Sequence, residues 1–130
     1  MDFKLHHCAL ICRDRDAAVH FFVDQLGMEL LRESESKRRG GMKLEIGVNG
    51  VYLFEVFAVP TTTTVDDPET TVGHNHVAFG VPNVAESLQW LEGRGIAVTE
   101  CKYDALAERD YGFFYGPDGI KFELYQTDEA

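Results

Sequence analysis

The two halves of this chain repeat the same spacing of histidine and glutamate. A shift of 69 residues places His7 on His76, and a shift of 68 residues places Glu55 on Glu123. In both halves the histidine opens an extended apolar segment, and the glutamate lies in a later one. A hydrophobic core has no reason to repeat these two residue types, whereas a shared divalent-metal site does. The pattern predicts a duplicated unit, with the functional site where the halves meet.

Chain length sets the expected domain organisation. A chain of 130 residues can build one core, or two half-sized units that share one, but not two independent domains. We therefore expect a single domain, 1–130, made of repeat units 1–59 and 74–127. The stretch 60–73, PTTTTVDDPETTVG, is rich in Thr, Pro and Asp without periodicity, which is typical of a linker.

Charge and composition exclude several classes of partner. The net charge of −10 argues against a nucleic-acid or anionic-membrane surface, so we expect a small-molecule partner. The chain has no apolar signal region at its start and no run of about 18 apolar residues, which predicts a cytoplasmic protein without a membrane span. Its three cysteines form no CxxC pair, so neither a disulfide framework nor a structural zinc site is indicated.

Lys37, Arg38 and Arg39 form the single basic run of this acidic chain. Such a run is either a solvated loop or a loop that contacts an anion above a cleft. Both interpretations stay open from the sequence.

The first half reads as strand, helix and three strands. A strand over about 4–13 is apolar on both faces, so we expect it to be buried. Asp14 is a suitable N-cap for a helix that runs to about Leu26 and stops at Gly27. A second strand is expected over 28–33.

Asn49-Gly50 between MKLEIGV and VYLFEVFAV predicts a hairpin with a type I′ turn. A regular two-residue turn places Leu44 opposite Glu55, and Glu55 on one face with Leu44 and Ile46. Burying a carboxylate there costs several kcal/mol, which implies a metal or a hydrogen-bonded partner. The alternative is an edge-strand glutamate that reaches water.

The second half repeats the order. It predicts a strand over 75–81, a helix over about 83–93, a strand over 97–103 and a hairpin over 111–126 that turns at 117–119. The expected fold class is α+β. Two β-α-β-β-β units form a curved mixed sheet around a metal-binding cleft, with the helices outside.

Four segments resemble the vicinal-oxygen-chelate superfamily of glyoxalases, bleomycin-resistance proteins and extradiol dioxygenases. They span nearly the whole chain, and the likeness is strongest to small bacterial glyoxalase I-like proteins. The segments are HHCALICRDRDAAVHFFVDQLGMEL, GVNGVYLFEVFAVP, GHNHVAFGVPNVAESLQWLEGRGI and FFYGPDGIKFELYQ.

The resemblance implies a metal-dependent enzyme. It makes His7, Glu55, His76 and Glu123 the ligands of one divalent ion per site, which would be Ni, Zn, Co, Mn or Fe. The expected activity is that of a glyoxalase-like lyase or isomerase, in which the metal chelates vicinal substrate oxygens and stabilises an enediolate during proton transfer. Glu123 is the implied base and Glu55 its symmetric counterpart. Members of this size are usually homodimers.

Other activities of the superfamily remain open. A methylmalonyl-CoA-type epimerase would use Glu45 as a second base, but the regular hairpin register turns Glu45 away from the metal face, and only a bulge near Gly47 would restore it. A fosfomycin-type thiol transferase, an extradiol dioxygenase and a non-catalytic drug-sequestering protein are further alternatives. The candidate substrate-binding residues are Arg38, Arg39, Tyr103, Arg109 and Phe113.

Overall fold

The chain divides into two compact units. A computed structural model describes residues 2–63, 67 and 69–128. Unit 1 comprises Met1–Thr64 and unit 2 comprises Val65–Ala130, so the division falls inside the stretch expected to be a linker. Residues 64–66 and 68 of that stretch lie outside the described residues.

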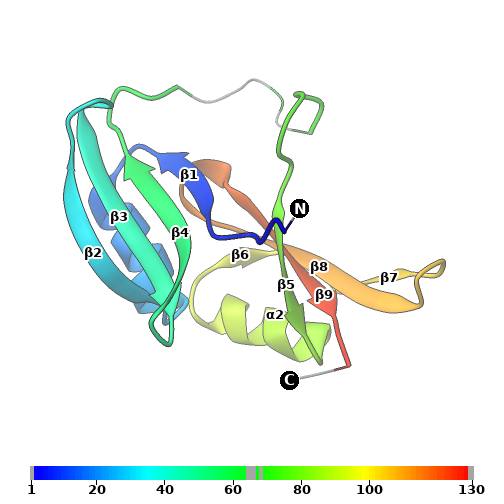
Figure 1. The fold of residues 1–130 in the computed structure, drawn as a ribbon. Coiled ribbons are helices and arrows are strands. Elements are labelled where there is room, and N and C mark those ends of the chain that lie inside the picture. Colours follow the sequence, from blue (N-terminus) through cyan, green and yellow to red (C-terminus); the bar gives the residue numbers. More distant parts are fainter. Residues whose placement is uncertain (1, 64–66, 68, 129–130) are drawn as a thin grey trace. The chain divides into compact units, whose positions relative to one another are not determined.

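Unit 1 forms a four-stranded mixed sheet in the order β1-β4-β3-β2, with helical segments along one face (Figure 1). Strands β1 and β4 are parallel, and the other neighbours are antiparallel. The elements are β1 (Cys8–Cys12), α1 (Arg15–Val19), the π-helix η1 (His20–Gln25), β2 (Glu29–Ser36), β3 (Gly41–Val48) and β4 (Val51–Ala58).

Unit 2 repeats this topology in a second mixed sheet, ordered β5-β9-β8-β6 with β7 paired to β8. The expected α+β class and the β-α-β-β-β order of each unit are confirmed, although the strand expected over 97–103 is split into two short strands. The elements are β5 (Val77–Val81), α2 (Val84–Gly93), β6 (Ala97–Val98), β7 (Lys102–Asp104), β8 (Arg109–Tyr115), the 3-10 turn η2 (Pro117–Gly119) and β9 (Lys121–Gln126).

Both helical segments begin where the sequence predicts. The Asp14 carboxylate accepts a hydrogen bond from the backbone N–H of Asp16 at 3.1 Å, and the Asn83 side chain accepts one from Glu86 at 3.0 Å. Gly27, with φ of 76°, ends the first helical segment as expected. The predicted single helix is a short α-helix that continues as a π-helix.

Each sheet buries one face against its helix. In unit 1 the ring of Phe22 lies 5.8 Å from that of Phe54, and both side chains are buried. In unit 2, Leu88 of α2 packs so closely on β8 that a side chain at Gly112 would clash with it. Within the described residues, the opposite face of each sheet carries no helix of its own unit.

The first strand is shorter than predicted and is not buried on both faces. It starts at Cys8 rather than near Lys4, and Ile11 is 42% exposed, whereas Cys12 on the other face is buried. The expectation of burial on both faces was therefore wrong. The helix of unit 1 covers one face only, and alternation along the strand turns Ile11 away from it.

The predicted type I′ turn is confirmed. Asn49 and Gly50 have φ of 51° and 77°, and Val48 pairs with Val51 as expected. These positive φ values suit Asn and Gly, and the twist of such a turn matches that of the flanking strands.

The register beyond this turn differs from the regular hairpin. A β-bulge between Ile46 and Gly47 shifts the pairing, so that Glu45, and not Leu44, lies opposite Glu55. The prediction that Glu55 shares a face with Leu44 and Ile46 was wrong, because both of these side chains are fully buried on the helix face. The bulge depends on Gly47, where a Cβ atom would run into the Val51 carbonyl.

Candidate metal-binding site

Each unit holds one histidine and one glutamate side by side on its open face. In unit 1, His7 directly precedes β1, and Ala9 pairs with Glu55 of β4. The small Ala9 side chain leaves room above the sheet, and His7 Nε2 lies 3.9 Å from Glu55 Oε1. The pair is half-buried, with the glutamate side chain 22% exposed.

Unit 2 builds the same pair from the same strands. His76 directly precedes β5, Ala78 pairs with Glu123 of β9, and His76 Nε2 lies 3.4 Å from Glu123 Oε1. Both glutamates stand on interior strands, because β4 lies between β1 and β3, and β9 lies between β5 and β8. The alternative of an edge-strand glutamate was therefore wrong.

The residue before each histidine binds its other ring nitrogen. Asn75 Oδ1 lies 2.7 Å from His76 Nδ1, and an amide oxygen only accepts, so His76 Nδ1 carries the hydrogen. The other ring nitrogen, Nε2, faces Glu123 Oε1. In unit 1, His6 Nδ1 lies 2.8 Å from His7 Nδ1, and either ring can be the donor. Nδ1 contacts of this kind set the tautomer of a ligating histidine.

Tyr52 forms one wall of the pair in unit 1. Its ring stacks on His7 with centroids 4.8 Å apart and planes 13° apart. Burial, together with the negative charges of Glu55 and Glu45, raises the pKa of Tyr52 to about 12. The hydroxyl therefore stays protonated at neutral pH and is available as a hydrogen-bond donor.

Charged side chains surround Glu55. Lys43 Nζ lies 3.8 Å from Glu55 Oε2 and 3.9 Å from Glu45 Oε2, and Arg32 Nε lies 3.9 Å from Glu45 Oε2. The bulge at Gly47 brings Glu45 into this group. In the observed register Glu45 is the cross-strand partner of Glu55, so both side chains lie on the same face. The sequence analysis missed Lys43 as a neighbour of Glu55, because the regular hairpin register places it on the other face of the sheet.

An aromatic ring and a lysine surround Glu123. The Phe113 ring lies 5.5 Å from the His76 ring, and Lys121 Nζ lies 4.2 Å from the Phe113 centroid. Lys121 also binds Glu69 Oε1 at 2.9 Å. The hydrogen bond from Lys121, followed by one from Asn75, holds the pKa of Glu69 below its usual range.

The five predicted substrate residues occupy different positions. Phe113 lies beside His76, and the Arg39 guanidinium lies 4.4 Å above the ring of Phe57. Arg109 stands at the start of β8 and pairs with Asp128 at 3.3 Å. Tyr103 pairs with Asp110 of β8. Phe113, which pairs with Glu123, and Tyr111 lie on one face of β8, so Asp110 and Tyr103 lie on the other face, away from Glu123. Arg38 is an exposed residue of the β2–β3 turn.

The donor set fits a divalent cation. Two ligands at about 2.1 Å from one ion stand about 3–3.4 Å apart at octahedral and tetrahedral angles. The 3.4 Å separation of His76 and Glu123 matches this spacing, and the 3.9 Å separation of His7 and Glu55 is slightly wider. Within the described residues no group of three or more His, Cys, Asp or Glu is gathered, so each unit offers two donors of its own.

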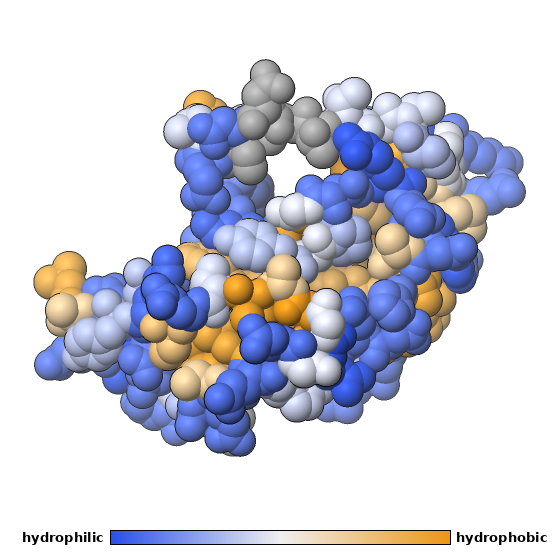
Figure 2. Space-filling model, turned by 180° about the vertical axis from the view of Figure 1, so that it is seen from behind, coloured by the Kyte–Doolittle hydropathy of each residue, from blue (hydrophilic) through white to orange (hydrophobic). Residues whose placement is uncertain are grey.

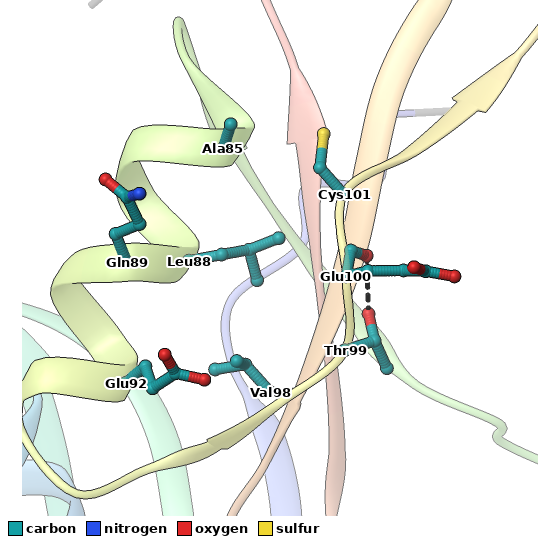
Figure 3. Close-up of a pocket in the computed structure, with 8 residues that line it drawn as sticks. All are labelled: Ala85, Leu88, Gln89, Glu92, Val98, Thr99, Glu100 and Cys101. Atoms are coloured by element: carbon teal, nitrogen blue, oxygen red, sulfur yellow. Dashed lines mark hydrogen bonds between the residues drawn. The ribbon is translucent and has the colours of Figure 1, made fainter.

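A pocket of about 210 Å³ lies on the other side of the unit 2 sheet (Figure 3). Its wall is formed by α2 and the segment 98–101, and Leu88 points from the helix toward that segment. Desolvation and the charge of Asp110 raise the pKa of the Cys101 thiol at its rim, which disfavours a nucleophilic thiolate. The pocket is thus separate from the His76–Glu123 pair.

The surface in Figure 2 is largely hydrophilic, with apolar areas between. Among the described residues no helix is long and apolar enough to cross a membrane. The exposed large apolar side chains include Phe3, Leu5, Val72 and Leu106.

Known proteins resemble this chain along nearly its whole length. It is 32% identical over 123 residues to the uncharacterized protein YwkD of Bacillus subtilis, covering 95% of this chain and 96% of the relative. It is 28% identical to the lactoylglutathione lyase of Escherichia coli O157:H7, covering 98% and 95%. The crystal structure of a glyoxalase family protein from Enterococcus faecalis superposes with a TM-score of 0.86 at 28% identity, covering 94% and 96%.

The family model of the Glyoxalase/Bleomycin resistance protein/Dioxygenase superfamily matches residues 4–124, a span that includes both histidines and both glutamates. The resemblance seen in the sequence motifs is confirmed by this match. The chain belongs to the Glyoxalase/Bleomycin resistance protein/Dioxygenase superfamily.

Proposed function

We propose that this chain is a metal-dependent, glyoxalase-like lyase or isomerase that acts on a small, oxygen-rich substrate. His7, Glu55, His76 and Glu123 bind the ion, which is Ni, Zn, Co, Mn or Fe. The observation that carries the proposal is the repetition of one His–Glu pair on the same strands of both units, with Nε2 facing the carboxylate each time. The similarity to a lactoylglutathione lyase supports the reaction class.

The reaction follows from the chemistry of these side chains. A bound divalent ion supplies a fixed positive charge to two neighbouring substrate oxygens. The Glu123 carboxylate takes a proton from the carbon beside a substrate carbonyl and returns it to the adjacent carbon, and Glu55 is its symmetric counterpart. The Glu123 side chain is only 15% exposed, so little water competes for its oxygens. Each unit also places an aromatic ring against its own histidine, Tyr52 against His7 and Phe113 against His76.

An epimerase-type reaction is the second candidate, and the bulge at Gly47 favours it. Glu45 stands directly opposite Glu55 on the same face, so a second carboxylate is available beside the first. One carboxylate could remove a proton while another group delivers one on the other side of the carbon. Glu45→Gln separates the two candidates, because it should abolish a two-base epimerisation and leave a one-base isomerisation largely intact.

We also propose that the protein is a homodimer, on the strength of its likeness to small members of the superfamily. Light scattering of the purified protein tests this, and a monomer at micromolar concentration would refute it.

The first experiment is metal content by elemental analysis of protein purified without a chelator or an affinity tag. The wild type is compared with the double variant Glu55→Ala, Glu123→Ala. The control is Glu35→Ala, Glu92→Ala, which removes one exposed glutamate from each unit away from the pairs.

Near-stoichiometric divalent metal in the wild type and the control, and its loss in the test variant, supports the proposal. Assays of methylglyoxal–thiol adducts and of epimerase substrates then choose between the two reactions. A wild type that binds no metal even after reconstitution would contradict the enzyme proposal and favour a ligand-sequestering protein.

A further inference from the structure

Two cations reach the open face of unit 1 beside the His7–Glu55 pair. Lys43 is the cross-strand partner of Phe57, and the Arg39 guanidinium lies 4.4 Å above the Phe57 ring. Phe57 follows Glu55 by two residues on β4 and therefore lies on the same face. Lys43 comes from β3 and Arg39 from the turn before it, so separate backbone segments bring the two charges to one aromatic residue.

The hydrogen-bond donors of both cations are still available. Lys43 Nζ is 3.8 Å from Glu55 and 3.9 Å from Glu45, which are distances of attraction but too long for hydrogen bonds. Arg39 makes no ion pair within the described part of the chain, although the protein has 22 acidic residues and 12 basic ones. A guanidinium with its plane against a ring presents its N–H groups at the edge, where they suit bidentate oxygen ligands.

We propose that Lys43 and Arg39 form an anion-binding subsite that holds a carboxylate or phosphate group of the substrate. This inference rests on the proposed function and narrows its substrate class to anionic compounds. Two residues of extended strand, about 7 Å, separate Phe57 from Glu55. The anionic group is therefore only a few bonds from the oxygens that face the His7–Glu55 pair, as in a short-chain oxo- or hydroxy-acid or its phosphate ester.

The local charge balance supports binding of an anion. Arg32, Lys43 and Arg39 outnumber the carboxylates Glu45 and Glu55 on this face. Lys43 lies across the strands from Phe57 and its Nζ is within 4 Å of both carboxylates, so its positive charge offsets their repulsion of an anion above Phe57. In a chain of net charge −10, such a local excess of cations gives a substrate anion one preferred place on this face.

The subsite is tested by titrating the purified protein with inorganic phosphate and, in a second arm, with acetate, followed by NMR of the arginine side chains and backbone amides. The variants are Arg39→Gln and Lys43→Gln. The matched control is Lys37→Gln, which removes the same charge from an exposed residue of the same turn.

We expect Arg39→Gln and Lys43→Gln each to weaken phosphate binding at least about tenfold, and Lys37→Gln to change it by less than about twofold. Tighter binding of phosphate than of acetate would assign the subsite to phosphorylated substrates, and the reverse to carboxylates. Absence of binding of either anion to the wild type, or equal weakening by all three variants, would overturn the proposal.

Metal content measured on the same preparations separates this inference from the proposed function. Phosphate held by a metal alone would bind equally well to the wild type and to both variants at unchanged metal content, which would refute the subsite and leave the metal site standing. Phosphate binding that requires Lys43 and Arg39 in a protein without metal would support the subsite and contradict the metal site.

Discussion

The open faces of the two units carry the same His–Glu pair in different surroundings. Opposite Glu55 stands Glu45, whereas opposite Glu123 stands Phe113. Lys43 is the charged neighbour in unit 1, where the corresponding position of unit 2 holds Tyr111. Unit 1 therefore places a second carboxylate and Lys43 beside its pair, whereas unit 2 places the Phe113 ring and Lys121 beside its own. A repeated scaffold can therefore keep one His–Glu pair in each unit while the residues around the two pairs differ.

The helix-covered faces, in contrast, are alike. Phe54 and Phe122 occupy corresponding positions, and both are buried, at 2% and 0% exposure. Close packing against a helix permits little variation, while an open face is free to diverge. The comparison thus separates the parts of each unit that build the fold from the parts that act on a ligand.

The largest expected effect is on the free energy of unfolding, and it tests whether the helix-covered cores of the two units are equivalent. Phe54→Ala and Phe122→Ala should each lower the free energy of unfolding by about 3–5 kcal/mol, because each leaves a cavity in a core of the same design. Denaturant unfolding followed by circular dichroism measures both. Exposed Val51→Ala is the control. A cost below about 1 kcal/mol for only one of the two would show that the two cores are not equivalent.

A smaller effect tests the residues that contact the Nδ1 atoms of the two histidines proposed as ligands, His7 and His76. Asn75→Ala and His6→Ala should weaken metal affinity about 10–100-fold, because the histidine orientation is lost while both ligands remain. Competition with a chromophoric chelator measures the affinity. His6→Asn imports the unit 2 arrangement and should retain affinity. If Asn75→Ala bound metal like the wild type, the Nδ1 contact of the preceding residue would not contribute to metal affinity, and the exchange of His6 for Asn75 between the units would not matter for binding.

The smallest effect tests the corresponding N-caps. Asp14→Ala and Asn83→Ala should each cost about 1 kcal/mol of unfolding free energy, since each frees a backbone N–H at a helix start. Asp14→Asn and Asn83→Asp keep an acceptor and should cost only a few tenths of that amount. Thermal unfolding gives the values. A neutral alanine variant at either position would mean that its cap bond is replaced by water.

Much of the fold could be read from local signals. The caps at Asp14 and Asn83, the stop at Gly27 and the Asn49-Gly50 turn depend on short-range preferences, and all are present in the structure. The split of the strand expected over 97–103 and the open second face of β1 were missed, because both depend on which face a distant element covers.

The candidate site divides in the same way. The sequence by itself located the repeated His–Glu pairs, because a duplicated strand order carries matching residues to matching places. Their role as metal ligands stays a proposal. Only the tertiary structure decided that Glu45 faces Glu55, that Lys43 pairs with Phe57 across the strands, and that Arg39 lies over the Phe57 ring. The physical reason is the bulge at Gly47. A shift of one residue in register turns every later side chain of a strand to the other face, and no local pattern reports which register the paired strands adopt.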